Sequence, residues 1–178
     1  MKKLVHTRKI SMRAFDLGDH TILIEGTLLD HQNRPKQNKT PEKPRLLHHM
    51  VIRLKVQGPV MLIERAEASM LHHPREECTE VLPWIRNLEG LRIVPGFTMK
   101  VKKVFGGIKG CAHLTSLIIS MGESAVQGYW AAYGKEMGDL DLRKQTVKAF
   151  VNTCHLWRED GPILTSLRET LELKNSSE

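Results

Sequence analysis

Residues 50–56 read Met50-Val51-Ile52-Arg53-Leu54-Lys55-Val56, and every even-numbered position among them is apolar. Arg53 and Lys55 fall on the other face, because successive side chains of a β-strand point to opposite sides. The segment therefore predicts a strand with one face toward a core and one toward solvent. Gln57-Gly58-Pro59 follows as a turn signal, and residues 60–70 supply the return strand.

The rest of the first half of the chain is also predicted to be β. Residues 10–15 alternate apolar and polar side chains, and residues 21–29 are rich in β-branched residues. Together with the two later strands they predict a four-stranded antiparallel meander. The segment 32–45 carries five basic residues, one acidic residue and several prolines, and we expect it to be a basic, solvated loop.

The second half of the chain is predicted to be helical. The patterns favour helices over residues 75–89 (interrupted by Pro83), 111–133, 142–156 and 162–173. Residues 97–105 suit a short helix or a strand, and residues 174–178 are expected to form a frayed tail. A meander followed by helices predicts the α+β class, with the helices packed on one sheet face in a single domain of residues 1–178.

Composition narrows the function classes. The chain has 178 residues, of which 26% are charged and 40% hydrophobic, as in ordinary soluble domains. No apolar run approaches the ~18 residues of a membrane span, and no apolar segment follows the basic N-terminus as in a signal peptide. We therefore expect a cytoplasmic protein without a membrane segment. Three cysteines without a CxxC pair argue against a disulfide framework.

The charge balance bears on partners. The net charge is +7, yet aromatic residues are only 5% of the chain and none stands among the lysines of the basic loop. A base-stacking surface is therefore not indicated, and nucleic acid is not the expected partner. The expected partner is another protein or a small anionic ligand.

A thiol and an imidazole stand two residues apart in Gly106-Gly107-Ile108-Lys109-Gly110-Cys111-Ala112-His113, just before an apolar helix. Backbone N–H groups at a helix start favour negative charge, which favours a thiolate at Cys111 and makes Gly107 and Gly110 candidates for an anion site. The two side chains would diverge on a regular helix. Both can reach one ion only if Cys111 lies in the turn before the helix.

Two more residues are candidates for the same site. His48 falls on the inward face of the 50–56 strand by period two, and Cys78 falls in the first turn of the 75–89 helix. Thiolates and neutral imidazoles bind zinc and other soft metals, so His48, Cys78, Cys111 and His113 are predicted as ligands of zinc or an iron–sulfur cluster. The alternative is structural: a hydrogen-bonded core histidine, and cysteines that act as small hydrophobes.

Several motifs together carry a family resemblance over roughly residues 8–160. They are Ile24-Glu25-Gly26-Thr27-Leu28-Leu29-Asp30, His48-x-Met50, Cys78, Leu88-x-Gly90-Leu91-Arg92-Ile93-Val94-Pro95-Gly96-Phe97, Gly107-x-x-Gly110-Cys111-x-His113-Leu114 and Thr153-Cys154-His155-x-Trp157. With these motifs the chain resembles a bacterial family known as domain of unknown function 2889. His49 and Ala112 stand where that family usually has Asp and Thr. The resemblance implies no assigned activity.

A fainter resemblance concerns the order of elements. An antiparallel meander followed by helices is similar to the iron–sulfur assembly scaffolds of the IscU/NifU type. That likeness implies a zinc or cluster site at the tip of the fold, with His48, Cys78 and Cys111 in the places of scaffold ligands. Leu46 and Gly110 stand where the scaffold has a cysteine and a histidine.

Three functions remain open from the sequence. The first is a metal- or cluster-binding domain. The second is a non-catalytic binding module that uses the basic loop and an anion site at the Cys111 helix start. The third is an enzyme with Cys111 as nucleophile and His113 or His48 as base.

Overall fold

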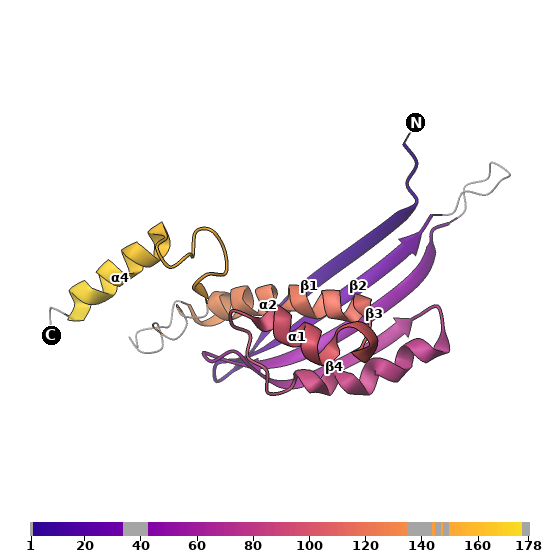
Figure 1. The fold of residues 1–178 in the computed structure, drawn as a ribbon, viewed down its shortest axis with the longest axis horizontal. Helices are drawn as coiled ribbons and strands as arrows, with labels where there is room; N and C mark the ends of the chain where they lie inside the picture. The colour runs from indigo at the N-terminus through magenta and orange to yellow at the C-terminus, as the bar shows by residue number, and fades with distance from the viewer. Residues whose placement is uncertain (1, 34–42, 135–143, 145–146, 148–149, 176–178) are drawn as a thin grey trace.

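The structure, a computed structural model, describes residues 2–33, 43–134, 144, 147 and 150–175. One antiparallel sheet has the order β1-β2-β3-β4, built from β1 (His6–Gly18), β2 (Thr21–Gln32), β3 (Arg45–Gln57) and β4 (Leu62–His72). The helices are η1 (Glu76–Leu88), α1 (Phe97–Phe105), η2 (Gly107–Lys109), α2 (Ala112–Tyr133) and α4 (Pro162–Asn175). The predicted α+β class, a meander followed by helices, is confirmed (Figure 1).

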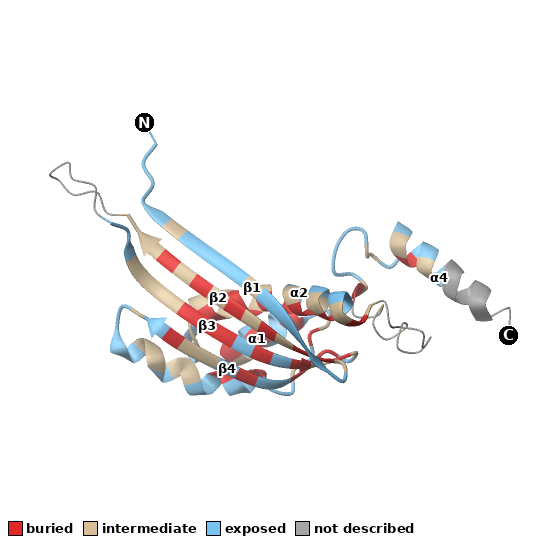
Figure 2. Cartoon of the chain, turned by 180° about the vertical axis from the view of Figure 1, so that it is seen from behind, coloured by how far each residue is buried: buried red, intermediate tan, exposed pale blue. Residues whose placement is uncertain are grey.

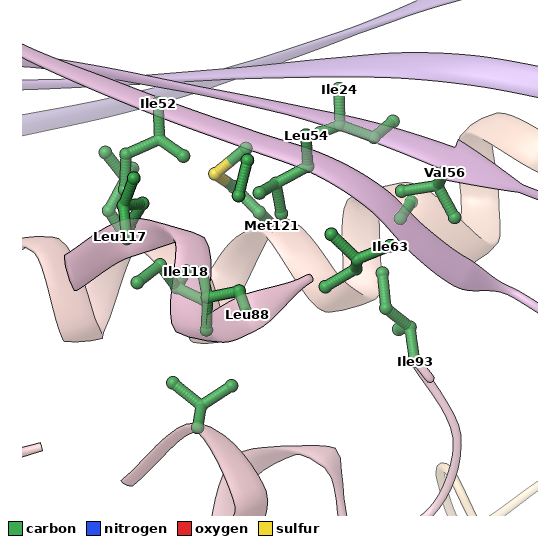
Figure 3. Close-up of a cluster of buried hydrophobic side chains, with 14 of the residues drawn as sticks. Ile24, Ile52, Leu54, Val56, Ile63, Leu88, Ile93, Leu117, Ile118 and Met121 are labelled. Carbon is green, nitrogen blue, oxygen red and sulfur yellow. The ribbon is translucent and has the colours of Figure 1, made fainter. Parts of the chain in front are cut away.

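The core lies between one face of the sheet and α2. Even-numbered residues of β2 and β3 point to this inner face, and they pack against the apolar stripe of the helix (Figure 3). The fully buried members from the sheet include Ile22, Ile24, Leu28, Ile52, Leu54 and Val56, and those from α2 include Leu114, Leu117, Ile118, Met121 and Ala125. β1, at the sheet edge, is exposed along most of its length (Figure 2).

A glycine lets α2 approach the edge strand. A Cβ built on Gly128 would lie 2.5 Å from the Cβ of Ala14 in β1. That distance is far inside van der Waals contact, and neither atom belongs to a flexible side chain. The helix therefore needs Gly128 at this position, although glycine costs ~1 kcal/mol relative to alanine in a helix interior.

We predict that Gly128→Ala destabilises the protein by about 1–3 kcal/mol in spite of its better helix propensity, because the added methyl overpacks the contact with Ala14. Urea unfolding followed by circular dichroism measures the change. The double variant Gly128→Ala/Ala14→Gly restores the space, so Gly128→Ala should cost much less in the Ala14→Gly background. An equal cost in both backgrounds would exclude this contact as the cause.

The C-terminal end of α2 is tied to the β1–β2 turn. The Tyr133 hydroxyl donates a hydrogen bond to Asp16 Oδ1, and the Gly18 N–H donates another to the same oxygen at 2.9 Å. These bonds hold the pKa of Asp16 below its usual 3.8. Burial, together with the Asp16 hydrogen bond, raises the pKa of Tyr133 from 10.0 to about 12. The bond thus joins a neutral phenol to an ionised carboxylate.

The difference in unfolding free energy between the wild type and Tyr133→Phe should therefore depend on pH. The full difference is expected between about pH 4 and pH 10, which are the ordinary pKa values of an aspartate and a tyrosine. It falls as the pH drops through the lowered pKa of Asp16, and again as the pH rises from 10 toward 12. Denaturant unfolding of both proteins across this range measures it, and a difference that does not change with pH would contradict the assignment.

The predicted helical segments agree with the structure in part. Residues 76–88 form a 3-10 helix rather than an α-helix, and Pro83 inside it has no N–H to donate. Residues 97–105, which suited either form, are helical. Of the predicted helix 142–156, residues 151–156 form turns and bends, and most of the remainder lies outside the described residues.

The predicted loop and tail are only partly described. Residues 34–42 of the basic loop and residues 176–178 of the tail fall outside the described residues. The last helix continues to Asn175, two residues past its predicted end. Among the helices that the structure describes, none combines the length and the apolar character needed to cross a bilayer.

Candidate metal centre

A buried acidic residue stands on the inner face of the sheet. Asp30 lies on β2 in the same alternation as Ile24 and Leu28, and only 1% of its surface is exposed. Removing a carboxylate from water is costly unless it is paired and hydrogen-bonded. The surroundings of Asp30 must therefore supply partners for both of its oxygens.

Arg8 supplies the first partners. It lies directly opposite Asp30 in the β1–β2 register, and its guanidinium donates from Nε to Oδ1 and from Nη2 to Oδ2, each at 2.7 Å. Such a bidentate pair is the strongest arrangement available between these groups. It holds the pKa of Asp30 below its usual value, so this carboxylate is ionised at neutral pH.

Histidines surround the same carboxylate. His48 faces Asp30 across the β2–β3 register, with its Nδ1 3.1 Å from Oδ2. His113 Nε2 lies 3.6 Å from Oδ2, and His6 Nε2 lies 3.4 Å from Oδ1. The His48 and His113 ring centres are 4.0 Å apart. Asp30, His48 and His113 each offer a ligand atom, and these three atoms all lie within 4.8 Å of one another.

The start of α2 places His113 over this end of the sheet. Cys111 is the N-cap residue of α2 and has an extended backbone (φ −122°, ψ 132°), so it precedes the helix. This is the placement that allows its side chain to lie on the same side as His113. Its Sγ lies 3.6 Å from His113 Nδ1. Nδ1 of the His113 ring thus faces the Cys111 thiol, and Nε2 of the same ring faces Asp30.

The charge state of His113 suits metal binding. Burial lowers the pKa of His113 from its usual 6.5, and the nearby His48 and Arg8 lower it further, while Asp30 acts in the opposite direction. The imidazole is therefore neutral at pH 7. A neutral ring offers its lone pair to an ion or accepts a proton from a thiol.

The predicted cysteines and glycines are placed less simply. His48 and His113 come together, and Cys111 contacts His113, but among the described residues the converging group contains neither Cys111 nor Cys78. Cys78 is half-buried against the core. A direct metal bond from either thiol stays a prediction.

The local backbone requires glycine at both positions before α2, Gly107 and Gly110. Gly107 has φ +61°, a left-handed conformation that glycine adopts without strain. A Cβ on Gly110 would lie 2.1 Å from the carbonyl oxygen of Phe105. The anion site predicted at these glycines stays a prediction.

Asp30, Arg8 and His6 were not predicted as site residues. The available signal was the parity of β2, because an aspartate in register with Ile24 and Leu28 must lie on the buried face. Such a carboxylate demands a cationic or metal partner. Arg8 could be assigned to it only once the pairing of β1 with β2 was known.

We predict that Arg8→Met lowers the unfolding free energy of the metal-free protein by about 2–3 kcal/mol at pH 7, because the buried Asp30 carboxylate loses its partner. Urea unfolding in the presence of a chelator measures this. Lys9→Met is the matched control, since Lys9 is the exposed next residue on the opposite face of β1. Equal stability of the two variants would show that the Arg8–Asp30 pair contributes nothing.

Comparisons with known proteins place the chain in a family without an assigned activity. A family model described as "Protein of unknown function (DUF2889)" matches residues 6–127, more than half of the chain. The match contains Arg8, Asp30, His48 and His113. No curated protein and no solved structure matches the chain. The likeness to IscU/NifU-type scaffolds therefore gains no support from these comparisons.

Proposed function

We propose a metal-binding function for this chain, which belongs to the DUF2889 family of proteins of unknown function. Asp30, His48 and His113 bind one divalent transition-metal ion at the end of the sheet under the first turn of α2. The observation that carries the proposal is the convergence of their three ligand atoms within 4.8 Å.

The spacing of these atoms suits a small ion. Metal–nitrogen and metal–oxygen bonds of zinc are about 2.0–2.2 Å, so neighbouring ligand atoms of a tetrahedral site stand about 3.3–3.5 Å apart. Asp30 Oδ2 lies 3.1 Å from His48 Nδ1 and 3.6 Å from His113 Nε2. These two separations need shifts of only a few tenths of an ångström. The ligand atoms of His48 and His113 lie within 4.8 Å of each other, so the two rings close by at most about 1.3 Å to bind the same ion. An ion bound there replaces the contact between His48 Nδ1 and Asp30 Oδ2, and a ligating Nδ1 leaves the ring hydrogen of His48 on Nε2.

The donor set favours one class of ion. Two imidazoles and one carboxylate suit Zn²⁺ or Fe²⁺, and three protein ligands leave a coordination position for water or a substrate atom. Iron–sulfur clusters are held mainly by thiolates. We therefore propose a mononuclear ion rather than a cluster.

Arg8 and Cys111 orient two of the proposed ligands, Asp30 and His113. Arg8 fixes the plane of the Asp30 carboxylate, and a carboxylate oxygen has a second lone pair that can reach the ion. Cys111 faces the nitrogen of His113 that does not face Asp30. In metal sites this second nitrogen ordinarily has a hydrogen-bond partner that fixes the orientation of the ring.

The Cys111–His113 contact also favours a second candidate. A thiol 3.6 Å from an imidazole whose other nitrogen faces a carboxylate has the arrangement of a nucleophile, a base and an orienting group. In that function His113 accepts the thiol proton from Cys111, and no ion is required. The two candidates differ in whether His48 is essential and whether the purified protein holds metal.

Elemental mass spectrometry of protein purified without oxygen and loaded with Zn²⁺ or Fe²⁺ tests the proposal. We expect about one ion per chain, and loss of that ion in His48→Gln and in His113→Gln. His49→Gln is the matched control on the opposite face of β3, and it should retain the ion. Cys111→Ser should keep the stoichiometry and weaken binding roughly 10–100-fold, as loss of a ligand's hydrogen-bond partner does.

Other outcomes reject the proposed ligand set. Full stoichiometry in His48→Gln would remove His48 from the site. Loss of the ion in Cys78→Ser would restore the cysteine ligand set expected from the sequence. Metal-free wild-type protein would favour the thiol chemistry of Cys111.

A further inference from the structure

A hollow of about 550 Å³ lies beside α2, apart from the metal centre. Ile119, Gly122, Glu123 and Val126 line it from one stripe of the helix, which differs from the stripe that packs on the sheet. Residues 93–98 form a second wall, and the third is made by Phe150, Asn152, Thr153, Cys154 and Trp157. This volume falls within the range of small-molecule sites.

Aromatic rings form much of its wall. The ring of Phe97 lies directly against the backbone of α2, since a Cβ on Gly122 would be only 2.8 Å from it. Across the hollow, Phe150 stacks on Trp157 with ring centres 4.8 Å apart. Trp130 meets Phe150 edge-on and anchors residues 150–157 to α2. The hollow is thus lined by large apolar surfaces that are held in place by packing.

Among the described residues that line the hollow, Glu123 is the one that carries a formal charge. Among the described residues, no lysine, arginine or histidine nitrogen lies within ion-pair distance of its carboxylate. Glu123 is exposed and lines the same hollow as Phe97, Phe150 and Trp157, so its carboxylate is open to a ligand that enters from solvent. A carboxylate next to aromatic faces is the chemistry that recognises organic cations.

We propose that this hollow binds a small organic amine: its aromatic or aliphatic part lies against Phe97, Phe150 and Trp157, and its ammonium group faces Glu123. The charge complementarity selects a cation over a neutral or anionic molecule of the same shape. The inference does not depend on the metal centre, because it uses none of the same residues.

Isothermal titration calorimetry of the full chain with three matched probes tests the proposal. The probes are 2-phenylethylamine, which is a cation at pH 7, neutral 2-phenylethanol and anionic phenylacetate. We expect saturable binding of the amine, roughly fivefold or more tighter than that of the alcohol, and no measurable binding of the acid. Glu123→Gln should reduce the affinity for the amine to that for the alcohol.

Glu80→Gln is the matched control, because Glu80 is exposed on η1 and outside the lining. It should leave the affinity for the amine unchanged. Circular dichroism of both variants shows whether they fold as the wild type does. The proposal is overturned if the amine does not saturate, if the alcohol binds as tightly as the amine, or if Glu123→Gln and Glu80→Gln behave alike.

Discussion

The packing of α2 on one face of the sheet decides where the functional groups of this protein lie. In β2 the alternation that turns Ile24 and Leu28 toward the helix also turns Asp30 toward it. A carboxylate on that face is tolerated only with partners, and the neighbouring strands supply Arg8 and His48 at the matching register positions. The polar cluster is therefore produced by the same parity that builds the core. It lies where the apolar stripe ends and the first turn of α2 begins.

Features set by local spacing could be predicted from the sequence. The alternation of residues 50–56 predicted the inward face of β3, and the contact of His48 with Asp30 agrees with that orientation. The divergence of Cys111 and His113 on a regular helix required Cys111 to precede it, and the extended N-cap conformation satisfies that requirement. These inferences need only periods of two and of 3.6 residues. Both periods are visible within short segments.

Features set by pairing between distant segments could not be predicted. Asp30 meets Arg8 only in the register that the β1–β2 turn imposes, and a slip of one residue would carry Arg8 to the outer face. That register cannot be predicted from the residue pattern of either strand alone. The place of Cys78 depends likewise on how η1, a 3-10 helix, packs on β4 and α1. Equivalent positions in the element order of a scaffold therefore do not establish that Cys78 reaches the histidines.

The long helix α2 connects the two proposed sites and also separates them. His113 lies in its first turn, and Glu123 lies ten residues later, which is about 15 Å along the axis. The first site uses side chains under the start of the helix, and the second uses a different stripe. Groups at such a separation without shared partners contribute additively. Metal loading should therefore leave amine affinity unchanged unless α2 moves as a rigid body. The close contacts at Gly122 and Gly128, where the helix backbone meets Phe97 and Ala14, oppose such a movement.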